Sequence, residues 1–397
     1  MTTQTLIDIE STYGANNYHP LDIVVKEANG VWVTDVDNKN YLDCLSAYSA
    51  LNQGHGHPAI LKTLVEQAGR VTLTSRAFRN EQLPLFCQEL SQLTGLPKVL
   101  PMNSGAEAVE TAVKAARKWG YDVKGIPENK AEIIVCRNNF HGRTISIISF
   151  SSEASYRHGF GPYTPGFVEI PFGDAEALAK AITPNTCAFL TEPIQAEAGI
   201  LIPPDGYLAA CQQICRENNI LFMLDEIQTG LGRTGKMFAW QYEAGVQPDC
   251  LTLGKALTGG FYPVSAFLAR EDVMNVFTPG IHGSTYGGNP LGCAVARTAL
   301  KVLQDENLTQ RAFELGAYFV EQLKTLETPL IKEVRGRGLL VGIELTEKAR
   351  PYCEALKDRG MLCKETHDTV IRIAPPLVIE KSDLDWAFAR IQSVLTT

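Results

Sequence analysis

The middle of this chain alternates short, continuous apolar runs with amphipathic helical patterns. The runs are EIIVC from residue 132, TISIISF from 144, CAFLTEP from 187, ILFMLDE from 220 and DCLTLGK from 249, and YLAACQQICRENN from 207 has helical spacing. Apolar runs without polar alternation are typical of strands that are covered on both faces of a sheet. We therefore predict an α/β layer fold with a mostly parallel sheet, and we interpret these runs as its strands.

Charged side chains stand at the C-terminal ends of three of these predicted strands. They are Glu192, Asp225 and Lys255. The carboxyl ends of parallel strands meet at one edge of a sheet, and ligands of open α/β sheets bind at that edge. The sequence therefore predicts a functional site there.

The pattern changes from Asn289 onward. Two long helical segments, LGCAVARTALKVLQDE and RAFELGAYFVEQLKTL, precede the strand-like segments VRGRGLLVGIEL and VIRIAPPLVI, which favours a smaller α+β lobe. A chain of 397 residues also exceeds one simple core. We expect residues 51–288 to form a large domain, residues 289–397 a small domain, and residues 1–50 a segment that joins the small lobe.

Composition excludes several classes of function. The net charge of -8 argues against a nucleic-acid ligand, which requires a basic face. The ten cysteines are scattered without a CxxC pair, as is typical of reduced thiols in a cytosolic protein. The N-terminal sequence has no secretory or transit pattern, and no apolar run reaches the length of a membrane span. We expect a cytoplasmic protein that does not cross a membrane.

Two of the strand-end residues suit one chemistry. Lys255 precedes small residues in DCLTLGKALTGG, and small neighbours let a flat ring approach its amine, although a lysine at a strand end is more often structural. Asp225 ends a buried run, where an unpaired carboxylate is costly to desolvate, so a cation must meet it. A protonated pyridine nitrogen meets this requirement. A structural arginine or a helix cap is the alternative.

Two further motifs suit the same ligand. Ser104, Gly105 and Ala106 form a turn that runs into an amphipathic helix, and free N–H groups at a helix start bind phosphate. The alternative is a plain helix cap with Glu107 in the first turn. Phe140 in NFHGRT offers an aromatic face for stacking on a ring, and a core aromatic is its alternative.

Taken together, these motifs resemble a known family. LDEIQTGLGRTGK, TLGKALTGG, NSGAEA, NFHGR and STYGGNP resemble those of the class III (ornithine/GABA-type) pyridoxal-phosphate aminotransferases, and the resemblance extends over essentially the whole chain. It implies the PLP-dependent transferase type I fold, with a large mostly parallel-sheet domain and a smaller α+β domain. It also implies pyridoxal 5'-phosphate as cofactor and a homodimer or higher homo-oligomer.

The resemblance implies roles for particular residues. Lys255 would hold the cofactor as a Schiff base and shuttle a proton, Asp225 would pair with the pyridinium, and Gln228 would donate to the ring hydroxyl. Phe140 would stack on the ring. The phosphate would be held by Ser104, Gly105 and Ala106, with Thr285 reaching in from a second subunit. The positions that receive substrate in relatives correspond to Tyr18, Tyr48, Arg143, Glu197 and Arg372.

Narrower motifs suggest the substrate. GANNYHP, SAYSALNQGHGHP, EPIQAEAG and RIAPPLVI are similar to those of ornithine-specific members. They imply ping-pong transfer of the δ-amino group of L-ornithine to 2-oxoglutarate, giving L-glutamate and L-glutamate 5-semialdehyde, which cyclises to pyrroline-5-carboxylate. Acetylornithine, GABA and other ω-amino acids are the alternative substrates. Tyr18 favours ornithine, because a tyrosine donor there selects an unacylated α-amino acid.

Two other hypotheses complete the sequence-based expectations. Glu197 is expected to pair with Arg372 across the cleft while ornithine reacts, and to release it for glutamate, whose distal carboxylate Arg143 would hold. The alternative is a structural ion pair that clamps the lobes. From a different functional class, a nucleotide-dependent oxidoreductase or a non-catalytic binding protein is possible on an α/β scaffold, although GLGRTG does not match GxGxxG.

Overall fold

A seven-stranded sheet forms the centre of the chain in this computed structural model, which describes residues 1–396. The strand order is β4-β10-β9-β8-β7-β5-β6, and β10 runs antiparallel to both of its neighbours while β9, β8, β7, β5 and β6 are parallel. The predicted mostly parallel sheet is confirmed. Its strands are β4 (Lys98–Met102), β5 (Glu132–Cys136), β6 (Phe167–Ile170), β7 (Thr186–Thr191), β8 (Leu221–Asp225), β9 (Cys250–Leu253) and β10 (Ser265–Ala269).

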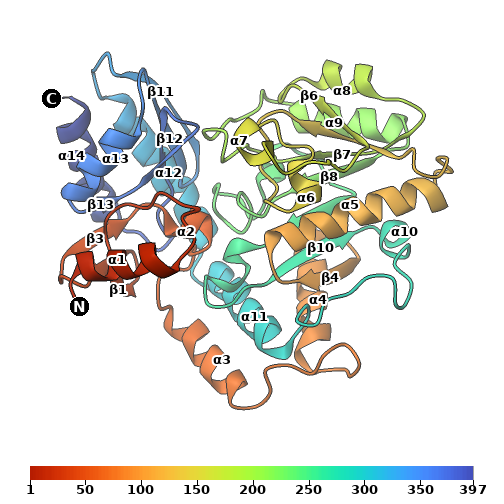
Figure 1. Cartoon of the computed structure of the whole chain (residues 1–397), viewed down its shortest axis with the longest axis horizontal. Helices are drawn as coiled ribbons and strands as arrows, with labels where there is room; N and C mark the ends of the chain where they lie inside the picture. Colours follow the sequence, from red (N-terminus) through yellow and green to blue (C-terminus); the bar gives the residue numbers. More distant parts are fainter. Residues whose placement is uncertain (397) are drawn as a thin grey trace.

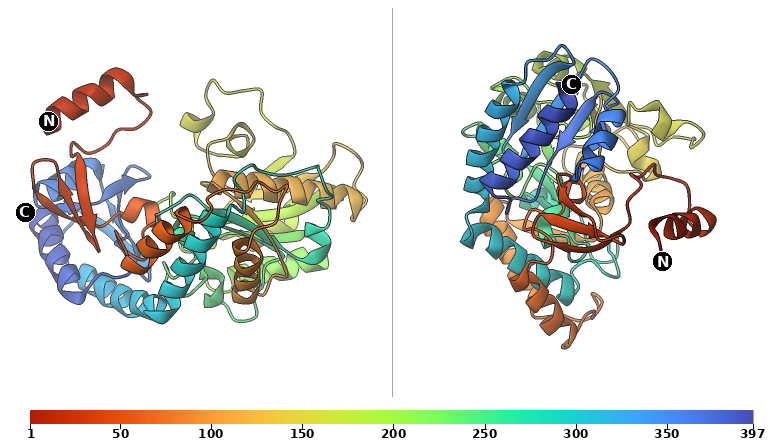
Figure 2. Two further views of the ribbon diagram at one scale, coloured as in Figure 1. Left: turned by 90° about the horizontal axis from the view of Figure 1, so that it is seen from below. Right: turned by 90° about the vertical axis from the view of Figure 1, so that its left-hand side faces the viewer.

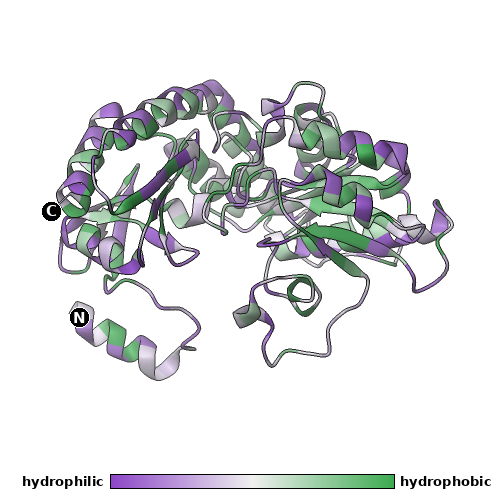
Figure 3. Ribbon diagram, turned by 90° about the horizontal axis from the view of Figure 1, so that it is seen from above, coloured by the Kyte–Doolittle hydropathy of each residue, from purple (hydrophilic) through white to green (hydrophobic). Residues whose placement is uncertain are grey.

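Helices cover both faces of this sheet (Figure 1). Along β5, Ile133 and Val135 pack in the cluster beneath α5 (Gly105–Asp122), whereas Ile134 belongs to the cluster on the opposite face, with α8 (Ala175–Ala181) and α9 (Tyr207–Glu217). Figure 3 shows the strands mostly green, between helices that turn purple residues outward. Burial on both faces explains why the strands lack polar alternation.

One predicted strand is wrong. The run TISIISF contains the short helix α6 (Ile145–Ile148), and the edge strand is β6 instead. Ile147 and Ile148 are buried in this turn while Ile145 is 53% exposed, so only one side of the segment packs against the protein. A short apolar run does not distinguish a strand from a turn of helix, and here packing against α5 decides for the helix.

Two smaller sheets lie beside the large one. β11 (Ile331–Arg337), β12 (Leu340–Leu345), β15 (Val370–Ile373) and β14 (Lys364–Thr366) form an antiparallel sheet. The other sheet joins β1 (Val25–Asn29), β2 (Trp32–Asp35) and β3 (Asn40–Asp43) to β13 (Met361–Leu362), which is parallel to β3. This pairing supports our proposal that residues 1–50 belong with the small lobe, in a division at 51–288 and 289–397.

The remaining elements connect these layers. Figure 2 shows α1 (Thr3–Tyr13) standing apart from the body of the chain, and none of its residues is buried. No helix within residues 1–396 is long and apolar enough to cross a membrane. The other elements are α2 (Ser46–Ser49), α3 (Pro58–Ala68), α4 (Gln82–Thr94), α7 (Ala154–Arg157), η1 (Ala239–Tyr242), η2 (Lys255–Thr258), α10 (Glu271–Met274), α11 (Pro290–Asp305), α12 (Leu308–Lys324), α13 (Arg350–Asp358) and α14 (Lys381–Leu395).

The backbones of Gly316 and Gly338 approach each other closely, and a substitution there tests the packing of α12. A Cβ atom at Gly316 in α12 would lie 2.0 Å from the carbonyl oxygen of Gly338. We expect Gly316→Ala to destabilise the fold by about 1–3 kcal/mol, because the overlap is with backbone that has no rotamer to change. Gly69→Ala is the control, since its Cβ would meet nothing closer than 3.5 Å. Urea unfolding of both variants provides the measurement, and equal midpoints would contradict the packing described here.

Candidate active site

Lys255 lies directly beyond the end of β9, where the chain turns into η2. Its φ of 45° is in the left-handed region, which is unusual for a residue with a side chain. The side chain lines a cavity of about 210 Å³ at the carboxyl edge of the large sheet. The cavity is lined by Gly105, Ala106, Phe140, His141, Glu192, Asp225, Ile227, Gln228, Thr229 and Lys255. The three charged residues at predicted strand ends therefore share one cavity.

Asp225 has a buried partner from the protein itself, His141. Nδ1 of His141 lies 2.6 Å from Oδ2 of Asp225, and the backbone N–H of Ile227 donates to Oδ1 at 3.0 Å. Burial opposes protonation of His141, but its hydrogen bond to Asp225 and the charges of Asp225 and Glu192 raise its pKa above the ordinary value. His141 was not predicted from the sequence, although it stands beside Phe140 in NFHGRT. Its position next to a predicted cofactor-stacking residue was the feature of the sequence that could have indicated a role in the site.

Glu192 is a second residue with no predicted role in the site. Its Oε2 accepts a hydrogen bond from the backbone N–H of Phe140 at 3.1 Å, which fixes the chain next to that ring. The pKa of Glu192 is raised to about 8, because burial and the negative charge of Asp225 raise it more than the positive charge of His141 lowers it. The pKa of Glu192 therefore lies well above that of an exposed glutamate.

The predicted phosphate turn contains a helix cap as well. Oγ of Ser104 accepts from the N–H of Glu107 at 3.2 Å, and the Glu107 carboxylate accepts from the N–H of Ser104 at 2.8 Å. The alternative reading of Ser104 as a cap is thus present in the structure. The N–H groups of Gly105 and Ala106 have no acceptor among residues 1–396. Both residues line the cavity, so these two donors are available to an anion.

These residues are suited to pyridoxal phosphate. An amine, a carboxylate, an aromatic side chain and free N–H groups at a helix start all line one cavity. Two buried polar atoms of lining residues, Nε2 of His141 and Oε1 of Gln228, have no hydrogen-bond partner among residues 1–396. Thr285 is exposed and lies outside this lining, so its own chain does not bring it to the cavity.

A second cavity, of about 490 Å³, also has Phe140 in its lining. The predicted substrate residues come together there, from segments far apart in the sequence: Tyr18, Tyr48, Arg143, Glu197 and Arg372. The segments EPIQAEAG and RIAPPLVI therefore meet at this cavity, as the sequence analysis expected.

Arg372 on β15 is the most deeply buried charge of this cavity, with 1% of its side chain exposed. It forms an ion pair with Oε1 of Glu197 and lies over the ring of Tyr48, with 4.8 Å between its Cζ and the ring centre. Burial alone would raise the pKa of Glu197. The positive charges of Arg372 and Lys255 and a hydrogen bond from Gln228 lower it, and the net shift is downward. Glu197 is therefore ionised. It neutralises Arg372.

Arg143 is held differently. Its Cζ lies 3.5 Å from the ring centre of Tyr156 and 5.6 Å from that of Phe140, and it forms no ion pair among residues 1–396. The sequence analysis also missed Tyr156, which lies on α7 and lines the same cavity. Tyr18 stands at the rim and is 71% exposed.

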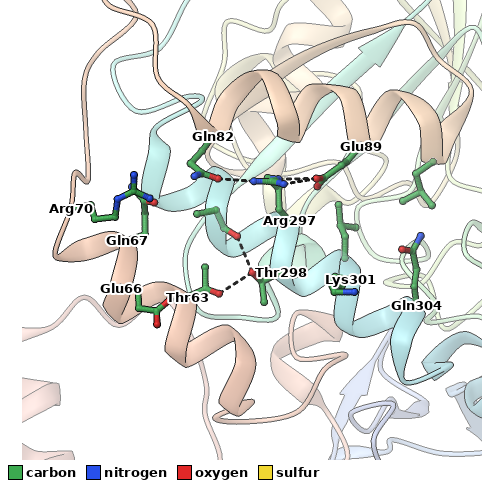
Figure 4. Close-up of a pocket in the computed structure, with 13 residues that line it drawn as sticks. Thr63, Glu66, Gln67, Arg70, Gln82, Glu89, Arg297, Thr298, Lys301 and Gln304 are labelled. Carbon is green, nitrogen blue, oxygen red and sulfur yellow. Dashed lines mark hydrogen bonds and ion pairs between the residues drawn. The ribbon is translucent and has the colours of Figure 1, made fainter.

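A third cavity lies elsewhere, between α3, α4 and α11 (Figure 4). It measures about 540 Å³ and is lined by polar side chains. Arg297 pairs with Glu89 at 2.7 Å, and Thr63 and Thr298 hydrogen-bond to each other at 2.9 Å. Among residues 1–396, none of its lining side chains has a buried polar atom without a partner, unlike the cavity around Lys255.

Comparison with known proteins decides the family. The model for aminotransferase class-III matches residues 13–395. The chain belongs to this family. The ornithine aminotransferase of Brevibacillus brevis is 62% identical over 393 residues, which are 99% of this chain and 98% of that protein. Family membership excludes the oxidoreductase and binding-protein alternatives.

Solved structures agree with this class III assignment. The ornithine aminotransferase from Toxoplasma gondii ME49 has a TM-score of 0.98 at 44% identity, covering 100% of this chain and 95% of that chain. An acetylornithine aminotransferase from Elizabethkingia anophelis has a TM-score of 0.91 at 49% identity, covering 100% and 99%. A further structure of the Toxoplasma enzyme is described with PLP at its active site. Pyridoxal phosphate is the cofactor of this family, and the fold is type I as expected.

The position of Lys255 in this class III enzyme gives a direct test. We expect borohydride reduction of the wild type to attach the cofactor covalently, and Lys255→Ala to show no attachment, because the variant lacks the amine in the cavity. We expect turnover to fall by more than ~10²-fold, since the proton carrier is also lost. Mass spectrometry measures the attachment. Lys236→Ala, outside the cavity, is the control, and attachment to the Lys255→Ala chain would contradict the assignment.

Proposed function

We propose that this class III aminotransferase transfers the δ-amino group of L-ornithine to 2-oxoglutarate. The products are L-glutamate and L-glutamate 5-semialdehyde, which cyclises to pyrroline-5-carboxylate. The relative from Brevibacillus brevis is named for ornithine, which supports the proposal. The observation that carries it is the ion pair between Glu197 and Arg372 in the cavity shared with Arg143.

The ion pair allows one cavity to bind two different amino donors, ornithine and glutamate. Ornithine presents a side-chain amine with no carboxylate near the reacting carbon, whereas glutamate presents an α-amine beside a carboxylate. Arg372 would bind that carboxylate well, and without a partner it would leave an uncompensated buried charge when ornithine is bound. Glu197 supplies the partner for ornithine. The carboxylate of glutamate then takes its place, and Arg143 holds the distal carboxylate.

The remaining residues position the substrate and move a proton. Tyr18 at the rim donates to the α-carboxylate of ornithine, and Tyr48 forms one wall of the cavity beneath Arg372. When bound, pyridoxal phosphate supplies an electron sink for negative charge on the substrate carbon. Burial lowers the pKa of Lys255, while Glu197 raises it and Arg372 lowers it further. The amine is therefore more readily neutral than an ordinary lysine and able to accept a proton.

We further propose a homodimer or higher homo-oligomer that works in the cytoplasm. Thr285 is exposed on its own chain, and the donors of Gly105 and Ala106 lack acceptors, which supports a phosphate site completed by a second copy. Exposed apolar residues near these segments, Phe78 at 73% and Tyr286 at 52%, suit a contact between copies.

The acetylornithine reading is the second candidate, because the enzyme from Elizabethkingia anophelis covers the whole chain at 49% identity. The two candidate functions predict different preferred amino donors. Specificity constants for L-ornithine, N-acetylornithine and GABA, each with 2-oxoglutarate, separate them, with pyrroline-5-carboxylate detected as the cyclised product. A preference for N-acetylornithine over ornithine would contradict our proposal.

Asp225 provides a test of the cofactor role. Asp225→Asn keeps the shape of the side chain and its contact with His141 but removes the negative charge. We expect the variant to retain the cofactor while proton removal from ornithine slows strongly, because a neutral amide no longer favours a protonated pyridine nitrogen. Single-turnover absorbance measures this step. An unchanged rate with full cofactor occupancy would remove Asp225 from this role.

A variant of Glu197 tests whether its ion pair with Arg372 opens and closes with the substrate or is a permanent link between the lobes. Glu197→Ala leaves Arg372 permanently unpaired, so we expect the glutamate half-reaction to accelerate relative to the ornithine half-reaction. Stopped-flow absorbance measures the two half-reactions separately. A clamp between lobes would weaken both alike, and an unmoved ratio would show that the pair does not switch.

A further inference from the structure

The two arginines of the substrate cavity have the same kind of neighbour and different partners. Each lies over a tyrosine ring, Arg372 at 4.8 Å from Tyr48 and Arg143 at 3.5 Å from Tyr156. Arg372 also has the carboxylate of Glu197. Within residues 1–396, Arg143 forms no ion pair, and the aromatic side chains of Tyr156 and Phe140 hold its guanidinium.

We propose that Tyr156 is a positioning residue that sets specificity for dicarboxylic oxo acids. Its ring fixes the guanidinium of Arg143 at the place where the distal carboxylate of the acceptor binds. This inference rests on the proposed function, which gives Arg143 to that carboxylate. It adds a residue for which the family motifs suggested no role.

The geometry of stacking explains why a ring suits this task. A guanidinium is planar and carries its N–H donors at its edge, so a ring that covers its face leaves those donors free. A carboxylate partner would occupy the donors and would compete with the substrate. Arg372 needs a carboxylate partner because its charge must be neutralised while ornithine is bound. Arg143 remains available because Tyr156 covers the face of the guanidinium, and a hydrogen bond to the Tyr156 hydroxyl leaves the other donors free.

Tyr156 is itself held in place. It lies on α7, where Glu153 accepts hydrogen bonds from the backbone N–H and the hydroxyl of Ser155 at 3.0 and 2.8 Å. The carboxylate of Glu153 is thus engaged with its own segment, and it forms no ion pair with Arg143 within residues 1–396. Burial raises the pKa of Tyr156, and the charge of Arg143 lowers it in part, so the phenol stays neutral.

The same ring connects Arg143 to the cofactor cavity. Tyr156 packs edge-on against Phe140, with 6.2 Å between ring centres and 80° between planes. Phe140 lines both cavities. The position of Arg143 is therefore set relative to the aromatic residue proposed to stack on the cofactor, which fixes the length of acceptor that spans the site.

Acceptor discrimination tests the proposal on the holoenzyme. The readout is the ratio of kcat/KM for 2-oxoglutarate to that for pyruvate, which lacks the distal carboxylate, with ornithine as donor. We expect Tyr156→Leu to lower this ratio about 10-fold by raising KM for 2-oxoglutarate, because Arg143 loses the ring that orients it. Tyr156→Phe keeps the ring and should keep the ratio. The ornithine half-reaction should fall less than the 2-oxoglutarate half-reaction in Tyr156→Leu.

Two controls separate positioning from structural damage. Tyr163 lies 4.5 Å from Cζ of Arg157 in a similar stack on the same loop, but it does not line the cavity, so Tyr163→Leu should leave the ratio unchanged. Arg143→Leu should lower the ratio by itself. Adding Tyr156→Leu to it should cause no further loss, because the two residues act as one unit.

The outcomes distinguish this inference from the proposed function. An unchanged ratio in Tyr156→Leu, or equal losses for 2-oxoglutarate and pyruvate, would overturn the inference while leaving the proposed function intact. Losses that multiply in the double variant would also overturn it. A wild type inactive with ornithine would contradict the proposed function alone, and the acceptor comparison would then use the amino donor that the wild type accepts.

Discussion

The buried guanidinium of Arg233 holds together the segments that enclose the substrate cavity. It is fully buried and donates to the carbonyl oxygens of Leu339 and Pro375 at 2.9 and 2.6 Å, and to Ser46 Oγ and Asn52 Oδ1 at 3.1 and 2.6 Å. Burial lowers its pKa to about 9, while the charge of Asp43 raises it. A buried charge without such acceptors would be strongly destabilising, so these hydrogen bonds oblige the N-terminal and C-terminal segments to meet at one place.

One consequence is the unusual backbone of residues 46–49. Ser46, Ala47, Tyr48 and Ser49 have φ of 45°, 47°, 60° and 70°, a left-handed turn that costs roughly 1–2 kcal/mol per residue. Asp43 accepts a hydrogen bond from the backbone N–H of Ser46 at 2.8 Å. The Ser46 hydroxyl, which Arg233 contacts, donates to the carbonyl oxygen of Ala374, directly after β15, at 2.7 Å. Local preference would not form this turn. The network around Arg233 maintains it, and the turn presents Tyr48 to Arg372.

The sequence predicted the parts of the site that follow from topology. Glu192, Asp225 and Lys255 could be placed together because parallel strands end at one edge, and the resemblance placed Glu197 opposite Arg372. His141 and Tyr156 were missed because their roles depend on loop geometry: His141 is 84 residues from Asp225 in the sequence, and Tyr156 acts through a ring face that no motif marks. TISIISF was misassigned for a related reason, since tertiary packing and not its composition made it helical.

One oxygen atom of Glu197 contacts a residue of each cavity. Oε1 of Glu197 accepts both the guanidinium of Arg372 and, at 3.1 Å, the amide Nε2 of Gln228. Gln228 lines the cofactor cavity, whereas Arg372 lines the substrate cavity. A ligand carboxylate that draws Arg372 away from Glu197 therefore changes the electrostatic environment of the Gln228 amide at the same time, and movement of Glu197 would release that amide entirely. The residue that balances Arg372 therefore also orients a side chain of the neighbouring cavity.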